Sequence, residues 1–564
     1  MTTNTIRRFA FAFRLVLHGV GFLILALSQG LSADLVARRT LPMLIIQTDS
    51  KPVLNRSRIS AFAGIVDDVP GQTTQIEFEY AEISLRGNSS YHFPKKGYRL
   101  ELQHTGGQDK KVSLLGMPAN SDWVLYGSPT DRTFARNLLA HELWRAMDHY
   151  AVRWRFVELF VITNSTVQAG TANKLREQLA RVGHAWSTNE LSGGRISGNG
   201  LEKAELRLSE SFRGLYIVLE KIKRGKDRVA IARLGPTDET EPEITGGYII
   251  KKDDQGRAER GLLTGQEFKV RFEEPKEHEL TAEQRQWLTK FLDNLEKALY
   301  SREFRDLTRG YSAFIDVDSF IDFHWLVEVA KNADGYWFSQ YMHKDRGGKL
   351  AMGPIWDWDR TFGNPYFPET STNGWRFYAA KDPDYTWYRR LFEDPDFLQR
   401  YIDRWAELRT NVLATSNVLA LVDRIASQVT VGGAFERNAG RWEHGRTDVH
   451  IRAQAGVSHA AEIDDLKRWI RDRLSWIDSQ EFPKPNLSVA PIGATRMNQI
   501  SMSCPLGRIF FTTNRSDPRL RGGSPSPQAF EHTQPIAVAN GVIVTARVKS
   551  DHGLWSAPVI FHRE

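Results

Sequence analysis

Acidic side chains gather in the middle of the chain at two places rich in aromatic residues. Asp334 stands at the first place, and Asp357 and Asp359 stand at the second, within the sequence Trp-Asp-Trp-Asp. Burying carboxylates among tryptophan and tyrosine is costly unless a cation compensates their charge. Oxygen-rich clusters suit Mg²⁺ or Mn²⁺, which usually keep waters and take further ligands from substrate phosphates. The residue types therefore favour a divalent-metal site, although turns, helix caps and ordinary ion pairs would explain the same residues equally well.

A predicted hairpin would bring the two acidic places together. Residues 336–341 are aromatic-rich and strand-like, and residues 350–355 form a second apolar run. Gly347 and Gly348 lie between them and suit a turn, because glycine adopts positive φ at no steric cost. The apolar residues of 316–330 have helical spacing, and this helix would deliver Asn332 and Asp334 to the site.

A second candidate site is the polar loop Arg86-Gly87-Asn88-Ser89-Ser90. Its backbone N–H groups and hydroxyls suit an anion. Lys95 and Lys96 follow at the start of a predicted strand, where either ammonium group could reach a phosphate. Strand alternation points only one of them inward, and we favour Lys96. A polar hairpin loop with a solvated basic edge is the alternative.

Composition narrows the class of protein. The chain has 564 residues, of which 41% are hydrophobic and 25% charged, and its net charge is +7. This mild charge permits an anionic ligand such as a nucleotide but does not argue for DNA or RNA. With Cys504 as the single cysteine, no intrachain disulfide can form.

The N-terminus has the features of a secretory signal. Three arginines precede an apolar run over 15–27, and small and polar residues follow up to Ala33. We therefore predict a signal peptide over 1–33 and a secreted, periplasmic or cell-surface protein. No later segment is long and apolar enough to predict a membrane span after cleavage.

The remaining pattern indicates an α+β protein in which strands precede helices. Residues 164–208 interrupt it with a glycine- and serine-rich stretch that reads as a surface insertion, and residues 487–564 show short strands and many turns. Strands are predicted over 41–48, 59–66, 76–85, 93–102, 156–163, 213–222, 246–251 and 268–274, and helices over 132–147, 280–300, 316–330, 385–408, 418–429 and 459–479.

Several motifs resemble those of a known family. Asn332-x-Asp334, Trp356-Asp357-x-Asp359 with Phe362-Gly363, and RGNSS followed by FPKKxYRLxL are similar to the signature of the spore coat protein H (CotH) kinase family. The resemblance covers roughly 41–476 and implies an atypical protein-kinase-like, two-lobed domain over 34–482. Residues 487–564 resemble the chitobiase/hexosaminidase-type C-terminal module, a small β-sandwich of fibronectin type III-like architecture.

The family resemblance implies an exported atypical protein kinase that uses ATP with Mg²⁺ or Mn²⁺ to phosphorylate Ser or Thr of secreted or surface proteins. By analogy with other kinases, Asp357 is the main metal ligand and Asp334 orients or deprotonates the acceptor hydroxyl. The other implied roles are metal ligation, or bonding to its ligands, by Asn332 and Asp359, phosphate binding by Arg86 and Lys96, and adenine contact by Glu220.

Two alternatives to a kinase remain at this point. Ser339-Gln340 stands where kinases often carry a second-metal asparagine, which favours a catalytically inactive kinase-like surface scaffold or adhesin. Such a protein would bind envelope polysaccharide or protein through the β-sandwich. A metal-dependent hydrolase built on Asp-x-Asp would need a histidine ligand, whereas His324 and His343 are isolated and are predicted to be structural.

Overall fold

The computed structural model describes ten stretches of the chain, which fall into two compact units. The described residues are 41–48, 51–55, 57–67, 78–87, 90–163, 211–253, 261–365, 370–381, 384–442 and 458–563. We name the units the barrel unit, which includes residues up to 129, 153–221 and 424–449, and the helical unit, which includes 130–152, 222–423 and 450–564. The predicted signal peptide and the predicted insertion over 164–208 lie outside the described residues.

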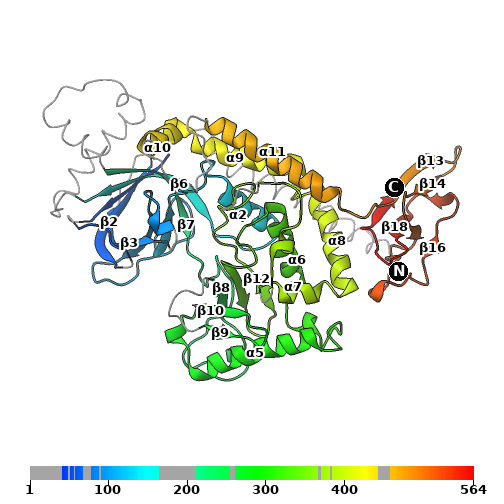
Figure 1. Cartoon of the computed structure of the whole chain (residues 1–564), viewed down its shortest axis with the longest axis horizontal. Helices are drawn as coiled ribbons and strands as arrows, with labels where there is room; N and C mark the ends of the chain where they lie inside the picture. The colour runs from blue at the N-terminus through cyan, green and yellow to red at the C-terminus, as the bar shows by residue number, and fades with distance from the viewer. Residues whose placement is uncertain are drawn as a thin grey trace, which may run out of the picture. The chain divides into compact units, whose positions relative to one another are not determined.

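Seven strands of the barrel unit close into a barrel. Their order is β1-β2-β3-β4-β5-β7-β6, and the closing pair of β1 and β6 is parallel, whereas every other neighbouring pair is antiparallel (Figure 1). The strands are β1 (Met43–Gln47), β2 (Ile59–Val66), β3 (Phe78–Arg86), β4 (Gly97–Gln103), β5 (Asp122–Tyr126), β6 (Trp154–Ile162) and β7 (Phe212–Glu220). Alternate residues such as Tyr98, Leu100 and Leu102 of β4 point into one buried core. Closure leaves the sheet without exposed edges.

Helix α10 (Ala434–Trp442) joins this unit although it lies far along the chain, and it packs on β7. The Asn438 side chain accepts a hydrogen bond from the Leu215 amide at 3.1 Å. Gly214, at φ +96°, permits the close approach, because a Cβ there would lie 2.5 Å from Asn438 Oδ1. Arg437 of the same helix ion-pairs with the fully buried Glu158 at 2.6 Å, which adds a second contact between α10 and the barrel.

A five-stranded antiparallel sheet forms part of the helical unit, in the order β12-β11-β8-β10-β9. Its strands are β8 (Tyr248–Lys252), β9 (Leu262–Leu263), β10 (Lys269–Glu274), β11 (Gln340–Lys344) and β12 (Leu350–Met352). Helix α5 (Ala282–Tyr300) turns an apolar face inward, and its Trp287 stacks on Tyr248 of β8 with ring centroids 6.0 Å apart. Strands and helices are thus mixed, as the α+β prediction requires.

The other α-helices among the described residues are α2 (Arg136–Ala146), α6 (Val317–Ala330), α7 (Thr386–Leu391), α8 (Pro395–Thr410), α9 (Thr415–Val429) and α11 (His459–Asp478). The single helix predicted over 385–408 is two helices. Asp394 caps a new helix through the Asp396 amide, and Pro395 occupies the first turn of α8, where its missing N–H costs nothing.

Within the described stretches, no single helix has both the length and the apolar character needed to cross a membrane. A bent pair, Thr415–Val429 with Val431–Trp442, meets the criterion by length and composition alone.

The C-terminal residues form two antiparallel sheets that share one core. One sheet holds β13 (Asn486–Pro491), β14 (Met497–Ser503) and β17 (Ile536–Ala539), and the other holds β15 (Arg508–Thr512), β16 (Phe530–Glu531), β18 (Ile543–Lys549) and β19 (Val559–His562). Ile500 of the first sheet and Phe511 and Val544 of the second belong to the same buried cluster. The resemblance to a fibronectin type III-like or chitobiase-type module stays a prediction.

Helix α6 is held by a buried histidine. His324 is fully buried, and its two ring nitrogens lie 2.8 Å from the hydroxyls of Tyr401 and Tyr385. Burial lowers the pKa of His324 to about 3, and burial followed by the charge of Arg145 lowers that of His141 in α2 to about 3. Both side chains are therefore neutral inside the folded protein, as the structural interpretation of His324 predicts.

Folding stability is expected to fall as the pH drops below about 6.5, because an unfolded histidine then binds a proton that the folded protein excludes. The folded-state pKa values of about 3 lie below the unfolded value, so each histidine removes about 2 kcal/mol of stability at pH 5. Urea unfolding between pH 5 and 8 measures this slope. His324→Gln should make the free energy of unfolding depend less steeply on pH, and His104→Gln, at an exposed position, is the control; an unaltered pH dependence in His324→Gln would contradict the assignment.

Candidate functional site

Helix α6 ends in a turn that shapes the first acidic place. Lys331, at φ +44°, closes the helix in the left-handed conformation. Asn332 is buried, and its side-chain oxygen accepts the Asp334 amide hydrogen at 2.9 Å. The Asp334 carbonyl then accepts the amides of Trp337 and Phe338 at 2.8 and 2.9 Å. The prediction of a strand over 336–341 is therefore wrong up to residue 339, since this local turn outweighs the strand propensity of the aromatic residues.

Two backbone hydrogen bonds join the first acidic place to the second. The Ala333 amide donates to the Arg360 carbonyl at 3.3 Å, and the Phe362 amide donates to the Ala330 carbonyl at 2.7 Å. Strands β11 and β12 pair antiparallel between them, with Met342 opposite Met352. The hairpin prediction is confirmed: the stretch that holds Asp334 and the stretch that holds Asp357 and Asp359 lie side by side.

The two aspartates of the second place have different environments. Asp357 is exposed and adopts φ +66°, whereas Asp359 is buried and accepts a hydrogen bond from the Thr130 hydroxyl. A non-glycine residue at positive φ is uncommon and costs energy unless its surroundings hold it there. Among the described residues, four of the ten non-glycine residues with positive φ lie in this short region, at Lys331, Ser339, Asp357 and Phe362. Such clustering of strain is typical of functional sites.

Helix α2 and the loop before it anchor the second place. The Asn137 side chain accepts the Trp358 amide hydrogen at 3.0 Å, and Arg136 Nε donates to the Phe362 carbonyl at 3.3 Å. The Asn364 amide group donates to the carbonyls of Asp359 and Thr130 at 2.8 and 3.1 Å. The sequence alone gives no sign of these roles of Arg136 and Asn137, because the two residues are distant along the chain from the segment that they hold.

A buried carboxylate that sequence reasoning missed lies beneath the first place. Glu328 of α6 is fully buried and accepts hydrogen bonds from the Tyr336 hydroxyl at 2.7 Å and the Arg376 amide at 2.6 Å. Arg376 in turn donates to the carbonyls of Asn332 and Ala333 at 3.1 and 2.6 Å. The signal that could have found Glu328 is an acidic residue in the otherwise apolar last turns of a helix.

In the barrel unit, the two candidate lysines have different partners. Lys95 is buried, and its Nζ donates to the Leu215 carbonyl and to Asn438 Oδ1, both at 2.7 Å. Lys96 is half-buried, donates to the Tyr91 carbonyl at 2.7 Å and lies 5.0 Å from the centre of the Tyr91 ring. The prediction that Lys96 points inward from a strand is wrong, because both lysines precede β4 and Lys95 is the buried one. Lys95 helps to hold α10 on the barrel, while Lys96 lies beside the polar loop.

The remaining candidates of the barrel unit are Arg86 and Glu220. Arg86 is half-buried and ends β3 opposite Gly97, and Asn88 and Ser89 of the polar loop lie outside the described residues. Glu220 ends β7 fully buried, and its carboxylate accepts the Arg153 amide at 2.9 Å and ion-pairs with the Arg153 guanidinium at 3.1 Å. The adenine contact that the family resemblance implies for Glu220 stays a prediction.

The candidate residues thus divide between the two units. Arg86, Lys96 and Glu220 belong to the barrel unit, whereas Asn332, Asp334, Asp357 and Asp359 belong to the helical unit. Of these, the structure brings the four residues of the helical unit into two adjoining stretches.

The acidic stretches do not form a metal site built from protein ligands alone, but they offer the few carboxylates that a magnesium site needs. Over the part of the chain that the structure describes, no three His, Cys, Asp or Glu side chains gather in a way that would hold a metal ion by themselves. Magnesium typically takes only one or two protein carboxylates and completes its shell with water and substrate phosphates. Asp357 and Asp359 supply as many carboxylates as such an ion takes from a protein, and their assignment as metal ligands stays a prediction.

Comparison with known proteins bears on the kinase resemblance. A family model described as CotH kinase protein matches residues 83–477, which include both acidic stretches, the two lysines that precede β4, and Glu220. A search of curated proteins finds no significant match.

Proposed function

Because the chain belongs to the CotH kinase family, we propose that it is an exported, metal-dependent protein kinase that transfers the γ-phosphate of ATP to Ser or Thr of secreted or surface proteins. The observation that carries this proposal is the backbone pairing of residues 330–333 with 360–362, which holds Asp334 beside the Asp357–Asp359 stretch. Phosphoryl transfer needs positioned carboxylates and charge neutralisation more than covalent chemistry by the protein.

In the proposed reaction, the hydroxyl oxygen of the acceptor Ser or Thr bonds to the γ-phosphorus of ATP, and the bond from that phosphorus to the ADP oxygen breaks. Asp334 accepts the proton that the hydroxyl loses. Asp357 and Asp359 would hold the divalent ion, which when bound neutralises charge on the phosphates. The Asn332 side chain already bonds to the Asp334 amide, so it would orient the base rather than supply a metal ligand. Arg86 and Lys96 would bind phosphates, and Glu220 would lie against adenine.

Export is part of the proposal and is supported by the basic and apolar N-terminal sequence. Polysaccharide binding by the β-sandwich belongs to the alternative function, an inactive scaffold. No nucleic-acid partner is proposed.

The test is direct. Purified protein is incubated with γ-labelled ATP, Mn²⁺ or Mg²⁺ and a serine-rich acceptor protein, with EDTA as the control. We expect label on the acceptor or on the kinase itself, lost on chelation. Absence of both transfer and a nucleotide-dependent thermal shift would favour the scaffold.

The two adjacent lysines provide a matched pair for the nucleotide site. Lys96→Met is expected to raise the KM for ATP by about tenfold or more with little change in Tm, because it removes a charge beside the polar loop, where the phosphates are proposed to bind. Lys95→Met is expected to lower Tm, because it removes the buried donor to Leu215 and Asn438. Steady-state kinetics and thermal unfolding of both variants measure this, and the reverse pattern would assign the phosphate to Lys95.

A further inference from the structure

The β-sandwich contacts helix α8 through a buried arginine. Arg547 of β18 has a side chain only 4% exposed, and it ion-pairs with Asp403 of α8 at 2.6 Å and with Asp517 at 2.7 Å. Its Nη1 also donates to the Ser556 carbonyl at 2.8 Å. Every charged nitrogen of this guanidinium therefore has an acceptor, as a buried arginine requires.

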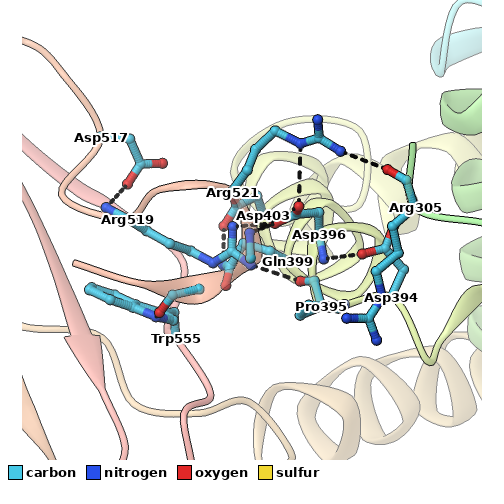
Figure 2. A network of polar contacts seen from close by, with 12 residues as sticks. Arg305, Asp394, Pro395, Asp396, Gln399, Asp403, Asp517, Arg519, Arg521 and Trp555 are labelled. Atoms are coloured by element: carbon cyan, nitrogen blue, oxygen red, sulfur yellow. Dashed lines mark hydrogen bonds and ion pairs between the residues drawn. The ribbon is translucent and has the colours of Figure 1, made fainter. Parts of the chain in front are cut away.

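A second arginine holds the start of the same helix (Figure 2). Arg519, 7% exposed, pairs with Asp396 at 2.7 Å and donates to the Pro395 carbonyl at 3.0 Å. The Gly522 amide also donates to Asp396, at 3.0 Å, and Gln399 donates to the Ser556 carbonyl at 3.3 Å. These contacts span the first half of α8.

This interface differs from that of a loosely tethered module. Arg508 and Glu531, in the same sandwich, form an ion pair whose side chains are 58% and 40% exposed, and such a pair contributes little to stability. Arg519 and Arg547 are instead buried and each pairs with a carboxylate of α8, so separating the sandwich from α8 would leave buried charges without these partners.

Helix α8 is in turn tied to α6. Arg404, which follows Asp403 in the chain, ion-pairs with the buried Asp322 of α6 at 2.7 Å. The Tyr401 hydroxyl hydrogen-bonds to His324 of α6 at 2.8 Å. Trp325 stacks on Tyr401 with ring centroids 3.9 Å apart and donates to the Tyr401 carbonyl at 2.9 Å. Helix α6 then leads directly into the turn of Asn332 and Asp334.

We propose that the C-terminal β-sandwich is a positioning element of the kinase, which fixes α8 through Arg519 and Arg547 and thereby fixes α6 and the turn that carries Asp334. The catalytic part of this inference rests on the proposed function. The mechanical part, coupling of the sandwich to the turn, stands on the contacts alone.

Hydrogen exchange and kinetics on the full chain test the two parts separately. In Arg547→Gln we expect amide exchange in peptides from α8 and from 331–338 to accelerate at least about tenfold, with no change in barrel peptides. We also expect kcat to fall about tenfold with the KM for ATP unchanged, since slight misplacement of a base is costly. Arg547→Lys, which keeps the charge but not the paired geometry, should give a smaller effect, and Arg508→Gln should behave as wild type.

The outcomes are distinguishable. Faster exchange confined to residues 486–563, with 331–338 and kcat unchanged, would overturn the proposal and leave the sandwich as an accessory module. If the wild-type protein transfers no phosphate, the proposed function fails, and faster exchange at 331–338 in Arg547→Gln still supports the coupling. If Arg547→Gln fails to fold, Arg547→Lys carries the same two measurements.

Discussion

Asp357→Asn is expected to reduce phosphoryl transfer by about a thousandfold or more while leaving the protein folded. Asp357 is exposed, so the substitution removes a charge from the surface and buries nothing. The lost carboxylate is the one we assign to the metal ion, which would neutralise charge on the phosphates in the transition state. Loss of such stabilisation costs about 10²–10³ or more in rate. Initial rates with labelled ATP, beside a thermal melt of each variant, measure the effect.

Asp334→Asn is the companion variant, which removes the proposed general base without removing the turn that holds it. Asparagine keeps the shape of the side chain, and the Asp334 amide remains bonded to Asn332, so the turn is expected to persist. Loss of a general base costs typically 10²–10⁴ in rate. Asp551→Asn, in an exposed turn of the sandwich, is the control and should retain full activity. Near-normal rates in both Asp334→Asn and Asp357→Asn would refute the assignment of the site.

Local sequence patterns predict much of what builds the acidic site. The apolar spacing before Asn332 identifies α6, and Asp316, a short polar residue before an apolar run, caps its start. The two glycines after β11 identify the hairpin that brings Asp357 back toward Asp334. These features depend on neighbours in sequence, and therefore the sequence alone displays them.

Long-range association could not be predicted in the same way. The parallel pairing of β1 with β6 closes the barrel, and α10 brings Asn438 to Lys95 across most of the chain length. No local sequence pattern encodes such pairs, because the residues that contact each other are far apart along the chain. This explains why sequence reasoning predicts Lys96, and not the buried Lys95, to point inward.

Glu328→Ala is expected to destabilise the protein by about 3–5 kcal/mol, because it leaves a buried cation without its partner. Arg473 and Glu328 are both fully buried, with Nη2 and Oε2 3.5 Å apart. Burial raises the pKa of Glu328 despite its hydrogen bonds, and burial lowers that of Arg473 to about 10 despite the nearby carboxylate. Both directions indicate that desolvation outweighs the attraction within the pair. Burying the pair therefore costs folding free energy, and removing one partner costs more because the other charge stays buried.

The double variant Glu328→Leu, Arg473→Met tests this interpretation. Replacing both members of a buried pair by apolar residues is often close to neutral, so its cost should be well below the sum of the single variants Glu328→Leu and Arg473→Met. Asp318→Ala provides the matched control on the same helix, because its ion pair with Arg400 is exposed and should be worth within about 1 kcal/mol. Denaturant unfolding of the variants gives the coupling energy between Glu328 and Arg473. If the losses in unfolding free energy of the two single variants simply added up in the double variant, the two side chains would not interact as a pair.

The same variants connect stability to the site. The Glu328 carboxylate binds the Arg376 and Phe377 amides, and the Arg376 side chain holds the carbonyls of Asn332 and Ala333. Removing the carboxylate frees this segment, so Glu328→Leu should lower kcat even at temperatures where the protein stays folded. The double variant should regain stability but not kcat, because leucine and methionine fill the space without accepting those amide hydrogen bonds. Recovery of both together would mean that Glu328 supports the fold alone.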